Sequence, residues 1–244
     1  MKTVFLIAML AVVLGGAWFV ADLPLFRSAA PDAEQVVILH GLGRSESAML
    51  ILENVLAGAG HEVHNLGYPS KDETPEELVA RISSAIDACC ADNDRPLHLV
   101  GHSLGGLLIR AYLARRKPVN LGRVVLLGTP NRGSELADVE EGIMGSMVTW
   151  AGPTAEMLGT GPDAFPASLP PPDYPVGVIA GTRDAIVTNE WLPLPNDSMV
   201  SVESAKLEGM TDFRTFHVTH WGLRNDLDVA DAVVHFLRHG AFPD

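Results

Sequence analysis

Cysteine is nearly absent from this chain: of 244 residues, only Cys89 and Cys90 are cysteines, and they are adjacent. Adjacent cysteines cannot join distant parts of a fold, so the chain has no long-range internal disulfide to stabilise it. We interpret the pair as two small residues near the end of a helix, in preference to a strained vicinal disulfide. The fold must then depend on its hydrophobic core, for which the 47% of hydrophobic residues provide the material.

Positively charged residues are also scarce, with 17 lysines and arginines against 30 aspartates and glutamates and a formal net charge of -13. An acidic protein repels phosphate backbones, so we expect no nucleic acid partner, and long-range attraction to anionic membrane surfaces is disfavoured. Spaced clusters of histidine and cysteine are missing, so the sequence does not support a metal site, and we expect no cofactor. A calcium site built from scattered carboxylates would not be visible in the sequence.

A long apolar run lies at the N-terminus. Lys2 precedes 18 residues, Val4–Ala21, that carry no charge. A positive residue followed by such a run is typical of an export signal, and its length also reaches the minimum for a membrane-spanning helix. We therefore expect residues 1–24 to be a cleaved signal peptide or an uncleaved membrane anchor. Both alternatives predict an exported protein, periplasmic, secreted or anchored in the inner membrane. Residues 25–244 are then one domain.

Strand-like and helix-like segments alternate along this domain. Short apolar runs such as Gln35–Leu39 are typical of strands buried on both faces. Thr74 is a helix N-cap candidate, since proline follows it and Glu77 completes a capping box. The alternation predicts a mostly parallel sheet with helices on both faces. The expected strands are residues 35–39, 61–66, 97–100, 123–127, 176–180 and 214–218, and the expected helices are residues 48–59, 75–91, 104–115 and 226–238.

The interval 133–174 does not follow this alternation. It contains several methionines and a tryptophan, and a proline-rich stretch, 166–175, follows. Because a loop of this length inside a compact domain is usually functional, we interpret the interval as a small, partly helical lid over a site.

A Gly-x-Ser-x-Gly motif at residues 101–105 makes Ser103 a candidate nucleophile. Such a serine stands on a sharp strand-to-helix turn, and the flanking glycines let the turn close without Cβ clashes. The bare pattern is weak evidence, because composition alone would produce it in about one chain of this length in ten. Its context strengthens it, since a strand is expected before the motif and a helix from Leu104 after it.

An oxyanion hole needs two N–H donors, and the sequence offers both. One is the N–H of Leu104, which follows the serine at the start of a helix. The other is the N–H of Leu42, in the His-Gly-Leu-Gly segment at residues 40–43 after the first expected strand. Glycines in this segment allow the backbone to approach a substrate closely.

Three segments together resemble bacterial α/β-hydrolase lipases and esterases, including the triacylglycerol-lipase-like and GPI inositol-deacylase-like groups. They are residues 40–43, residues 101–106 (Gly-His-Ser-Leu-Gly-Gly) and residues 127–134 (Leu-Gly-Thr-Pro-Asn-Arg-Gly-Ser). A fourth segment, residues 196–204, is similar to the acid-bearing loop of such lipases. The resemblance runs from about Val36 to the C-terminus and implies an α/β-hydrolase fold. One departure is Ser198, because relatives often have glycine directly after the presumed acid.

The base of a catalytic triad in this fold follows the acid in chain order. His220 is the candidate, because it lies after the last expected strand and before the final helix. His217 competes with it, but the prediction puts His217 inside the strand, where its side chain would point from a sheet face. His102 and His40 lie too early in the chain for this role, although both can shape the site.

Two aspartates compete for the role of the acid. Asp184 follows the expected strand 176–180, which is the position that many α/β-hydrolases use. Asp197 lies in the segment that resembles the lipase acid loop. The resemblance favours Asp197 and position alone favours Asp184, so both remain candidates.

These residues predict a serine hydrolase that cleaves carboxylic esters of apolar acyl groups, a lipase or carboxylesterase, through an acyl-enzyme. The expected partner is a small-molecule or lipid ester, and the N-terminal segment offers membrane association. The alternatives are an acyltransferase or thioesterase with the same triad, and a non-catalytic, membrane-anchored binding module on the same fold.

Overall fold

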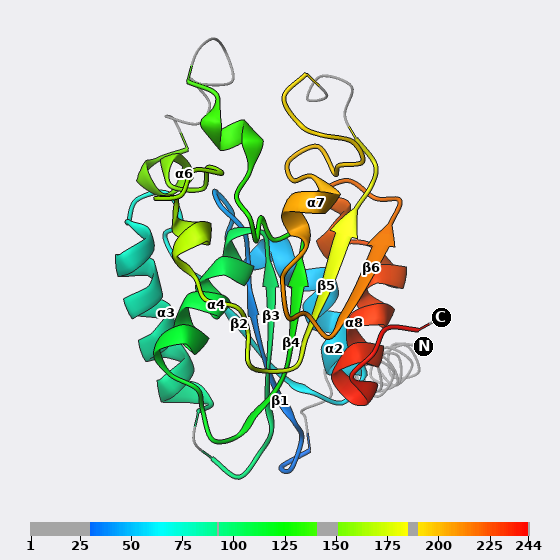
Figure 1. Ribbon diagram of the computed structural model, residues 1–244. Coiled ribbons are helices and arrows are strands. Elements are labelled where there is room, and N and C mark those ends of the chain that lie inside the picture. Colours follow the sequence, from blue (N-terminus) through cyan, green and yellow to red (C-terminus); the bar gives the residue numbers. More distant parts are fainter. Residues whose placement is uncertain (1–29, 92, 141–150, 185–189, 244) are drawn as a thin grey trace, which may run out of the picture.

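A computed structural model describes residues 30–91, 93–140, 151–184 and 190–243 (Figure 1). The segment predicted to be a signal peptide or an anchor, residues 1–24, lies outside the described residues. Everything that follows concerns the described part of the chain.

The centre of the fold is a six-stranded sheet in the order β2-β1-β3-β4-β5-β6. Every neighbouring pair of strands is parallel, so all the C-terminal strand ends lie at one edge. This confirms the predicted sheet type. The strands are β1 (Gln35–Leu39), β2 (Glu62–Leu66), β3 (Leu97–His102), β4 (Leu121–Leu127), β5 (Val176–Gly181) and β6 (Asp212–Phe216).

Helices cover both faces of the sheet, as the alternation predicts (Figure 1). The side chains of β1 show why, because Val37 and Leu39 join one buried apolar cluster while Val36 and Ile38 join another. The first cluster includes α3 (Pro75–Cys89) and α4 (Leu104–Arg115), and the second includes α2 (Leu50–Gly58) and α8 (Leu227–His239).

Local sequence signals explain where the long helices begin and end. The Thr74 side chain accepts a hydrogen bond from the Glu77 N–H, and the Glu77 carboxylate accepts one from the Thr74 N–H at 2.8 Å, so the predicted capping box is present. At α8, the Asp226 carboxylate caps the first turn, and Gly240 ends the helix with a left-handed φ of 79°.

Most element boundaries differ from the predicted ones by only one or two residues, and two segments show differences that matter for the fold or the site. The predicted helix 48–59 is a 3-10 turn, η2 (Glu46–Met49), followed by α2. Strand β6 lies two residues earlier than predicted, at residues 212–216, so His217 is not inside a strand. β6 is an edge strand whose residues are mostly half-buried, and it lacks the continuous apolar run that marks the central strands.

The interpretation of Cys89 and Cys90 as two separate helix residues is wrong, because the structure joins them in a disulfide. Successive side chains of a helix diverge by about 100°. Cys89 is the last residue of α3, and Cys90 leaves helical geometry with φ -142°. The change of backbone direction at Cys90 lets the two side chains meet.

The interval 133–174 contains three short helical turns within its described parts. They are η3 (Glu135–Asp138), α6 (Pro153–Glu156) and η4 (Phe165–Ser168). This agrees with the partly helical character predicted for the interval. α6 lies beyond the C-terminal ends of the strands (Figure 1). Residues 141–150 are outside the described residues, and the role of the interval as a lid stays a prediction.

Candidate active site

Ser103 stands on the turn between β3 and α4 with φ 56° and ψ -123°, a backbone conformation that non-glycine residues rarely adopt. Its N–H donates to the Leu127 carbonyl at 2.8 Å. The flanking glycines are needed: a Cβ at Gly101 would lie 2.4 Å from the Gly106 nitrogen, and one at Gly105 would lie 2.5 Å from the Leu39 oxygen. Backbone strain of this kind is concentrated at functional sites.

The loop at residues 40–43 lies directly beside this serine, since a Cβ at Gly41 would be only 3.0 Å from the Ser103 Cβ. The His40 ring stacks on Tyr68 with centroids 4.1 Å apart, and the Tyr68 hydroxyl donates to the His40 carbonyl. The Gly43 N–H donates to the Ser70 hydroxyl at 2.9 Å. The segment after β2 therefore holds the loop against the nucleophile.

His40 is neutral in this arrangement. Its Nε2 accepts a hydrogen bond from the Tyr68 N–H at 3.3 Å, which leaves the proton on Nδ1, 2.9 Å from the Gly41 carbonyl. Burial lowers the pKa of His40 and favours the same neutral form.

The two predicted oxyanion donors lie on elements that meet at Ser103. Leu104 is the first residue of α4, where an N–H has no partner within the helix. Leu42 follows Gly41, whose backbone is packed against the serine. Neither N–H has a hydrogen-bond acceptor among the described residues, so both are available to an oxyanion.

The candidate acid and the candidate base form a buried pair. His220 Nδ1 lies 2.8 Å from an Asp197 carboxylate oxygen, and the exposed fractions of the two residues are 5% and 1%. The main chains are joined too, because the His220 N–H donates to the Asp197 carbonyl at 2.8 Å. The other carboxylate oxygen accepts from the N–H groups of Met199 and Val200. One face of the carboxylate is thus fixed by the backbone, and the other orients the imidazole.

The structure places Asp197, and not the alternative Asp184, on His220 Nδ1. Asp184 follows β5 and is half-buried. The competing base, His217, is exposed, and its Nδ1 lies 3.4 Å from the Thr182 hydroxyl. Ser103, Asp197 and His220 are therefore the set that the fold brings to one edge of the sheet.

Two glycines that the motif analysis did not single out make room for the acid and base. Gly128 follows β4 with φ 53°, and a Cβ there would lie 3.1 Å from both Asp197 Oδ2 and His220 Nδ1. At the end of β5, a Cβ on Gly181 would lie 2.7 Å from the Asp197 Cβ. The resemblance of residues 127–134 to lipases was the one signal in the sequence that pointed to Gly128.

Other residues of the segment 127–134 form hydrogen bonds to the acid loop, which we define as residues 196–204, and to the residue after it. The Asn131 side chain donates to the Ala205 carbonyl at 2.7 Å, the Arg132 N–H to the Ser204 carbonyl at 3.0 Å, and the Ser134 hydroxyl to the Met199 carbonyl at 2.8 Å. These bonds span the acid loop on both sides of Ser201, so the segment after β4 sets the position of Asp197.

His102 is a further contributor that the sequence placed near the site without a defined role. The residue is buried, its Nε2 lies 2.9 Å from the His220 carbonyl, and the two rings are 4.7 Å apart. Burial first, and then the neighbouring His220, hold the pKa of His102 well below its usual range. A neutral His102 with its proton on Nε2 donates to that carbonyl and thereby supports the loop of the base.

The comparison with known proteins agrees with this geometry. The chain matches the alpha/beta hydrolase family over residues 36–240. It belongs to this family. The chain also resembles solved structures: the mature form of lipase BlEst2 from Bacillus licheniformis has a TM-score of 0.68 at 20% identity, covering 86% of this chain and 94% of that one. The type II thioesterase BorB has a TM-score of 0.58 at 20% identity, covering 89% and 96%. At such identities the likeness shows the fold alone.

Curated relatives of the chain include a triacylglycerol lipase from Burkholderia plantarii, 32% identical over 156 residues, which are 52% of this chain and 42% of the relative. A pimeloyl-[acyl-carrier protein] methyl ester esterase from Neisseria meningitidis is 32% identical over 127 residues, 50% of this chain and 49% of the relative. The match thus spans about half of this chain and less than half of either relative.

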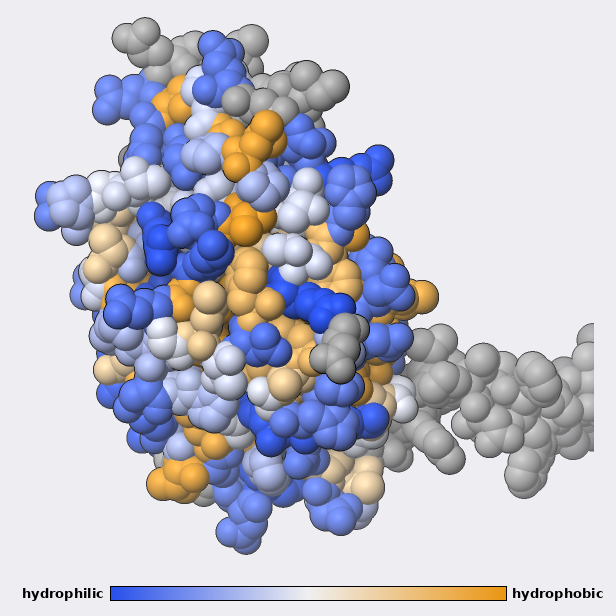
Figure 2. Space-filling view, turned by 45° about the vertical axis from the view of Figure 1, so that its right-hand side comes forward, coloured by the Kyte–Doolittle hydropathy of each residue, from blue (hydrophilic) through white to orange (hydrophobic). Residues whose placement is uncertain are grey.

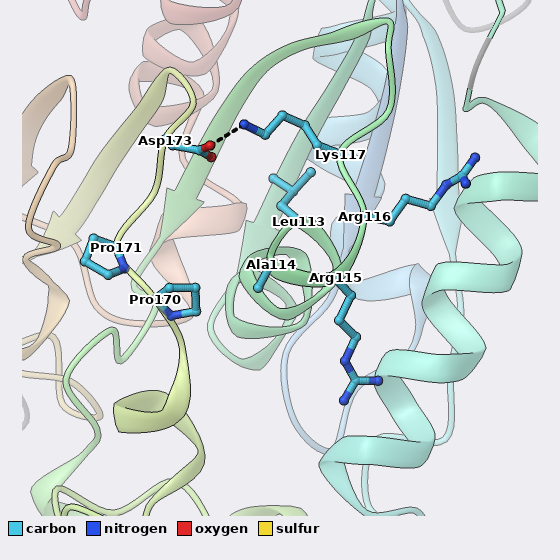
Figure 3. Close-up of a pocket in the computed structure, with 8 residues that line it drawn as sticks. All are labelled: Leu113, Ala114, Arg115, Arg116, Lys117, Pro170, Pro171 and Asp173. Carbon is cyan, nitrogen blue, oxygen red and sulfur yellow. Dashed lines mark hydrogen bonds and ion pairs between the residues drawn. The ribbon is translucent and has the colours of Figure 1, made fainter.

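A surface hollow of about 510 Å³ lies elsewhere on the protein, at the C-terminal end of α4 (Figure 3). It is lined by Leu113–Lys117 together with Pro170, Pro171 and Asp173, and Lys117 and Asp173 form an ion pair across it. Ser103 precedes the other end of α4, about 15 Å away at 1.5 Å per residue. The hollow is therefore not the candidate active site.

One group of metal-ligand side chains occurs in the described part of the chain: His64, Cys89 and Cys90, with ligand atoms within 4.8 Å of one another. Because the two sulfurs are bonded to each other, neither is a thiolate that could bind an ion. Within the described ranges, no helix has both the length and the apolar character needed to cross a membrane.

Proposed function

We propose that this chain is a serine hydrolase that cleaves carboxylic esters of apolar acyl groups through an acyl-enzyme. The observation that carries the proposal is the buried 2.8 Å contact between His220 Nδ1 and Asp197, at the same edge of the sheet as the strained serine that precedes α4. An aspartate on Nδ1 leaves Nε2 as the basic nitrogen, which is the arrangement that activates a serine.

The proposed mechanism has two half-reactions, the acylation of Ser103 and the hydrolysis of the acyl-enzyme. Ser103 Oγ attacks the ester carbonyl, while His220 Nε2 takes the serine proton and then passes it to the leaving alcohol. The N–H groups of Leu42 and Leu104 bind the oxyanion of the tetrahedral intermediate. Asp197 holds the imidazole tautomer and stabilises the imidazolium. Water then attacks the acyl-enzyme with His220 as the base, which releases the acid and restores Ser103.

Apolar side chains near the acid and the base support an apolar acyl group. Trp221 follows His220 and is 42% exposed, and Met199 follows Asp197 by two residues and is 38% exposed. Leu194, three residues before the acid, is 66% exposed. The space-filling view shows hydrophobic residues at the surface in its upper half, among hydrophilic ones (Figure 2). The relatives named as a triacylglycerol lipase and a methyl ester esterase favour the same reading.

Hydrolysis of 4-nitrophenyl esters from acetate to palmitate tests this function and measures the preferred chain length. We expect wild type to hydrolyse at least one ester and to be labelled by a fluorophosphonate probe. Ser103→Ala should fold normally, escape labelling and lose turnover by roughly 10⁶-fold, as removing a triad nucleophile does elsewhere. Full turnover by folded Ser103→Ala protein, or absence of labelling of wild type, would contradict the proposal.

We further propose that the protein is exported and that residues 1–24 act as its signal peptide or membrane anchor. The support is the charge of Lys2 before the uncharged run Val4–Ala21. Fractionation of the native host should find the protein outside the cytoplasm. Mass spectrometry of its N-terminus then separates cleavage from anchoring, and full-length protein that is soluble in the cytoplasm would refute export.

A further inference from the structure

Two arginines lie beside the catalytic elements without a role in the mechanism above. Arg44 follows Leu42, the proposed oxyanion donor, by two residues. Arg224 ends the 3-10 turn η6 (Gly222–Arg224) and follows His220 by four residues. Arg44 is therefore close in sequence to the proposed oxyanion donor, and Arg224 is close in sequence to the proposed base.

The Arg224 side chain crosses from the loop of the base to the segment that follows the oxyanion loop. Its Nη1 donates to the Ala48 carbonyl in η2 at 3.1 Å, so the guanidinium lies against the segment that begins just after Arg44. Arg224 is half-buried, and its Nε is buried without a hydrogen-bond partner among the described residues. Arg44 is exposed. The guanidinium of Arg224 therefore keeps hydrogen-bonding capacity that the described protein does not use.

The charges of these two arginines are not balanced locally. Neither forms an ion pair within the described part of the chain, although Glu46 is only two residues from Arg44 and acidic residues outnumber basic ones 30 to 17. Burial and the charge of Arg44 lower the pKa of Arg224, so the two guanidinium groups repel each other. Both also contribute, after burial and His220, to the lowered pKa of His102. The positive field therefore reaches the residue next to Ser103.

Two neighbouring cations without a counterion are costly to a fold, and such an arrangement is characteristic of functional sites. Guanidinium groups are suited to carboxylates and phosphates, to which they donate paired hydrogen bonds. We propose that Arg44 and Arg224 form a subsite for an anionic group, a carboxylate or a phosphate, carried by the ester substrate. This inference rests on the proposed esterase function and adds a charge preference to it.

Two matched pairs of substrates test the subsite. The first compares 4-nitrophenyl butyrate with mono-4-nitrophenyl succinate, which replaces the terminal methyl of the acyl chain by a carboxylate. The second compares 1-butyrylglycerol with 1-butyrylglycerol 3-phosphate, which adds the anion to the alcohol. We expect the anionic member of at least one pair to have the higher kcat/KM at low ionic strength. The preference should shrink in 0.5 M NaCl, because Arg44 is exposed and salt screens it.

The ratio of anionic to neutral kcat/KM should fall about tenfold in Arg224→Met and in Arg44→Met. Arg238→Met is the matched control: Arg238 also donates to a backbone carbonyl, that of Ala59 at 2.7 Å, and its loss changes the net charge equally, but it lies in the last turn of α8. This control should keep the wild-type ratio. If Arg224→Met does not fold, Arg44→Met alone decides, because Arg44 is an exposed loop residue.

A wild-type ratio at or below one for both pairs, or the same ratio in both arginine variants as in wild type, would overturn the subsite. These results are distinct from a failure of the proposed function. In that case wild type would hydrolyse neither the neutral nor the anionic esters, and Ser103 would not react with a fluorophosphonate.

Discussion

At the scale of single residues, Asp197 is held more firmly than its place in a loop suggests. Its carboxylate accepts backbone N–H bonds on one oxygen and faces His220 on the other, while its carbonyl accepts the His220 N–H. Four hydrogen bonds therefore hold Asp197, and two of them join it directly to His220. Such a carboxylate orients the imidazole before any substrate arrives, which lowers the reorganisation that the reaction requires.

This geometry predicts the result of a paired substitution. Asp197→Asn should reduce kcat about 10⁴-fold, because an amide cannot hold the required tautomer or stabilise the imidazolium. Asp184→Asn should remain close to wild type. Ester hydrolysis by the two purified variants, with circular dichroism to verify folding, checks the assignment. A crippled Asp184→Asn beside a nearly normal Asp197→Asn would show that the earlier aspartate is the acid.

His102 gives a second prediction at this scale. His102→Phe keeps an aromatic ring but removes the donor to the His220 carbonyl, which leaves that buried oxygen without its partner. A loss of this kind costs about 1–3 kcal/mol, so we expect kcat to fall about tenfold or more while KM changes little. His102→Gln, which restores an N–H donor, should recover part of kcat. Equal activities of the Phe and Gln variants would rule out the hydrogen bond as the cause.

The residues of the site differ in how visible they are in the sequence. Ser103 and His220 stand out because a motif and the chain order point to them. Asp197 needed the resemblance of its loop to lipases, since two aspartates occupied suitable positions. Gly128 and the donor role of His102 depend on contacts across about 70 to 120 residues of sequence, which no local pattern records. The departure at Ser198 has a structural counterpart: Ser198 has a φ of 85°, a left-handed conformation that the glycine of relatives adopts more readily.

At the scale of elements, the sequence predicts all six strands of the described sheet in their order along the chain, and the predicted bounds agree best for one strand and one helix. Strand β1 and helix α4 have the predicted bounds, because continuous apolar runs and strong helix signals mark buried elements. The sequence predicts the edge strand β6 two residues too late, and it extends the predicted end of α3 two residues too far. Both errors lie where burial is partial and the apolar pattern fades, so the sequence constrains the boundary weakly.

The packing of α4 on β1 predicts a sharp difference between two glycines. A Cβ at Gly105 would lie 2.5 to 2.8 Å from backbone atoms of Leu39 and His40, which cannot move aside, whereas a Cβ at Gly58 in α2 meets nothing within 4 Å. Gly105→Ala should lower the free energy of unfolding by about 1–3 kcal/mol and reduce activity. Gly58→Ala should raise it by about 0.5–1 kcal/mol. Urea denaturation checks both, and a neutral Gly105→Ala would contradict the tight contact.

At the scale of the whole molecule, four buried histidines other than His220 have a lowered pKa, and burial is the first cause at each of them. His98 and His102 lie on β3, His40 directly follows β1, and His61 directly precedes β2. The folded protein therefore resists taking up protons that the unfolded chain accepts near its ordinary histidine pKa of about 6.5. Acidic solution is therefore expected to lower the free energy of unfolding through all four histidines.

The stability of the protein should consequently depend on pH in a defined window. Because the unfolded state binds more protons below about pH 6.5, the free energy of unfolding should be highest above that pH and fall as the pH drops. Each of these four histidines contributes up to about 1.4 kcal/mol per pH unit until its folded pKa is passed. Urea denaturation at pH 7.5, 6.5 and 5.5 should show this loss.

The free energy of unfolding of His98→Gln should fall less than that of wild type over this range, and the exposed control His239→Gln should match wild type. Carboxylates whose pKa is lowered by an arginine partner, such as Glu62, change the free energy of unfolding only near and below pH 4.5, outside this window. A free energy of unfolding that stays constant or rises between pH 7.5 and 5.5 would show that burial does not keep these histidines neutral.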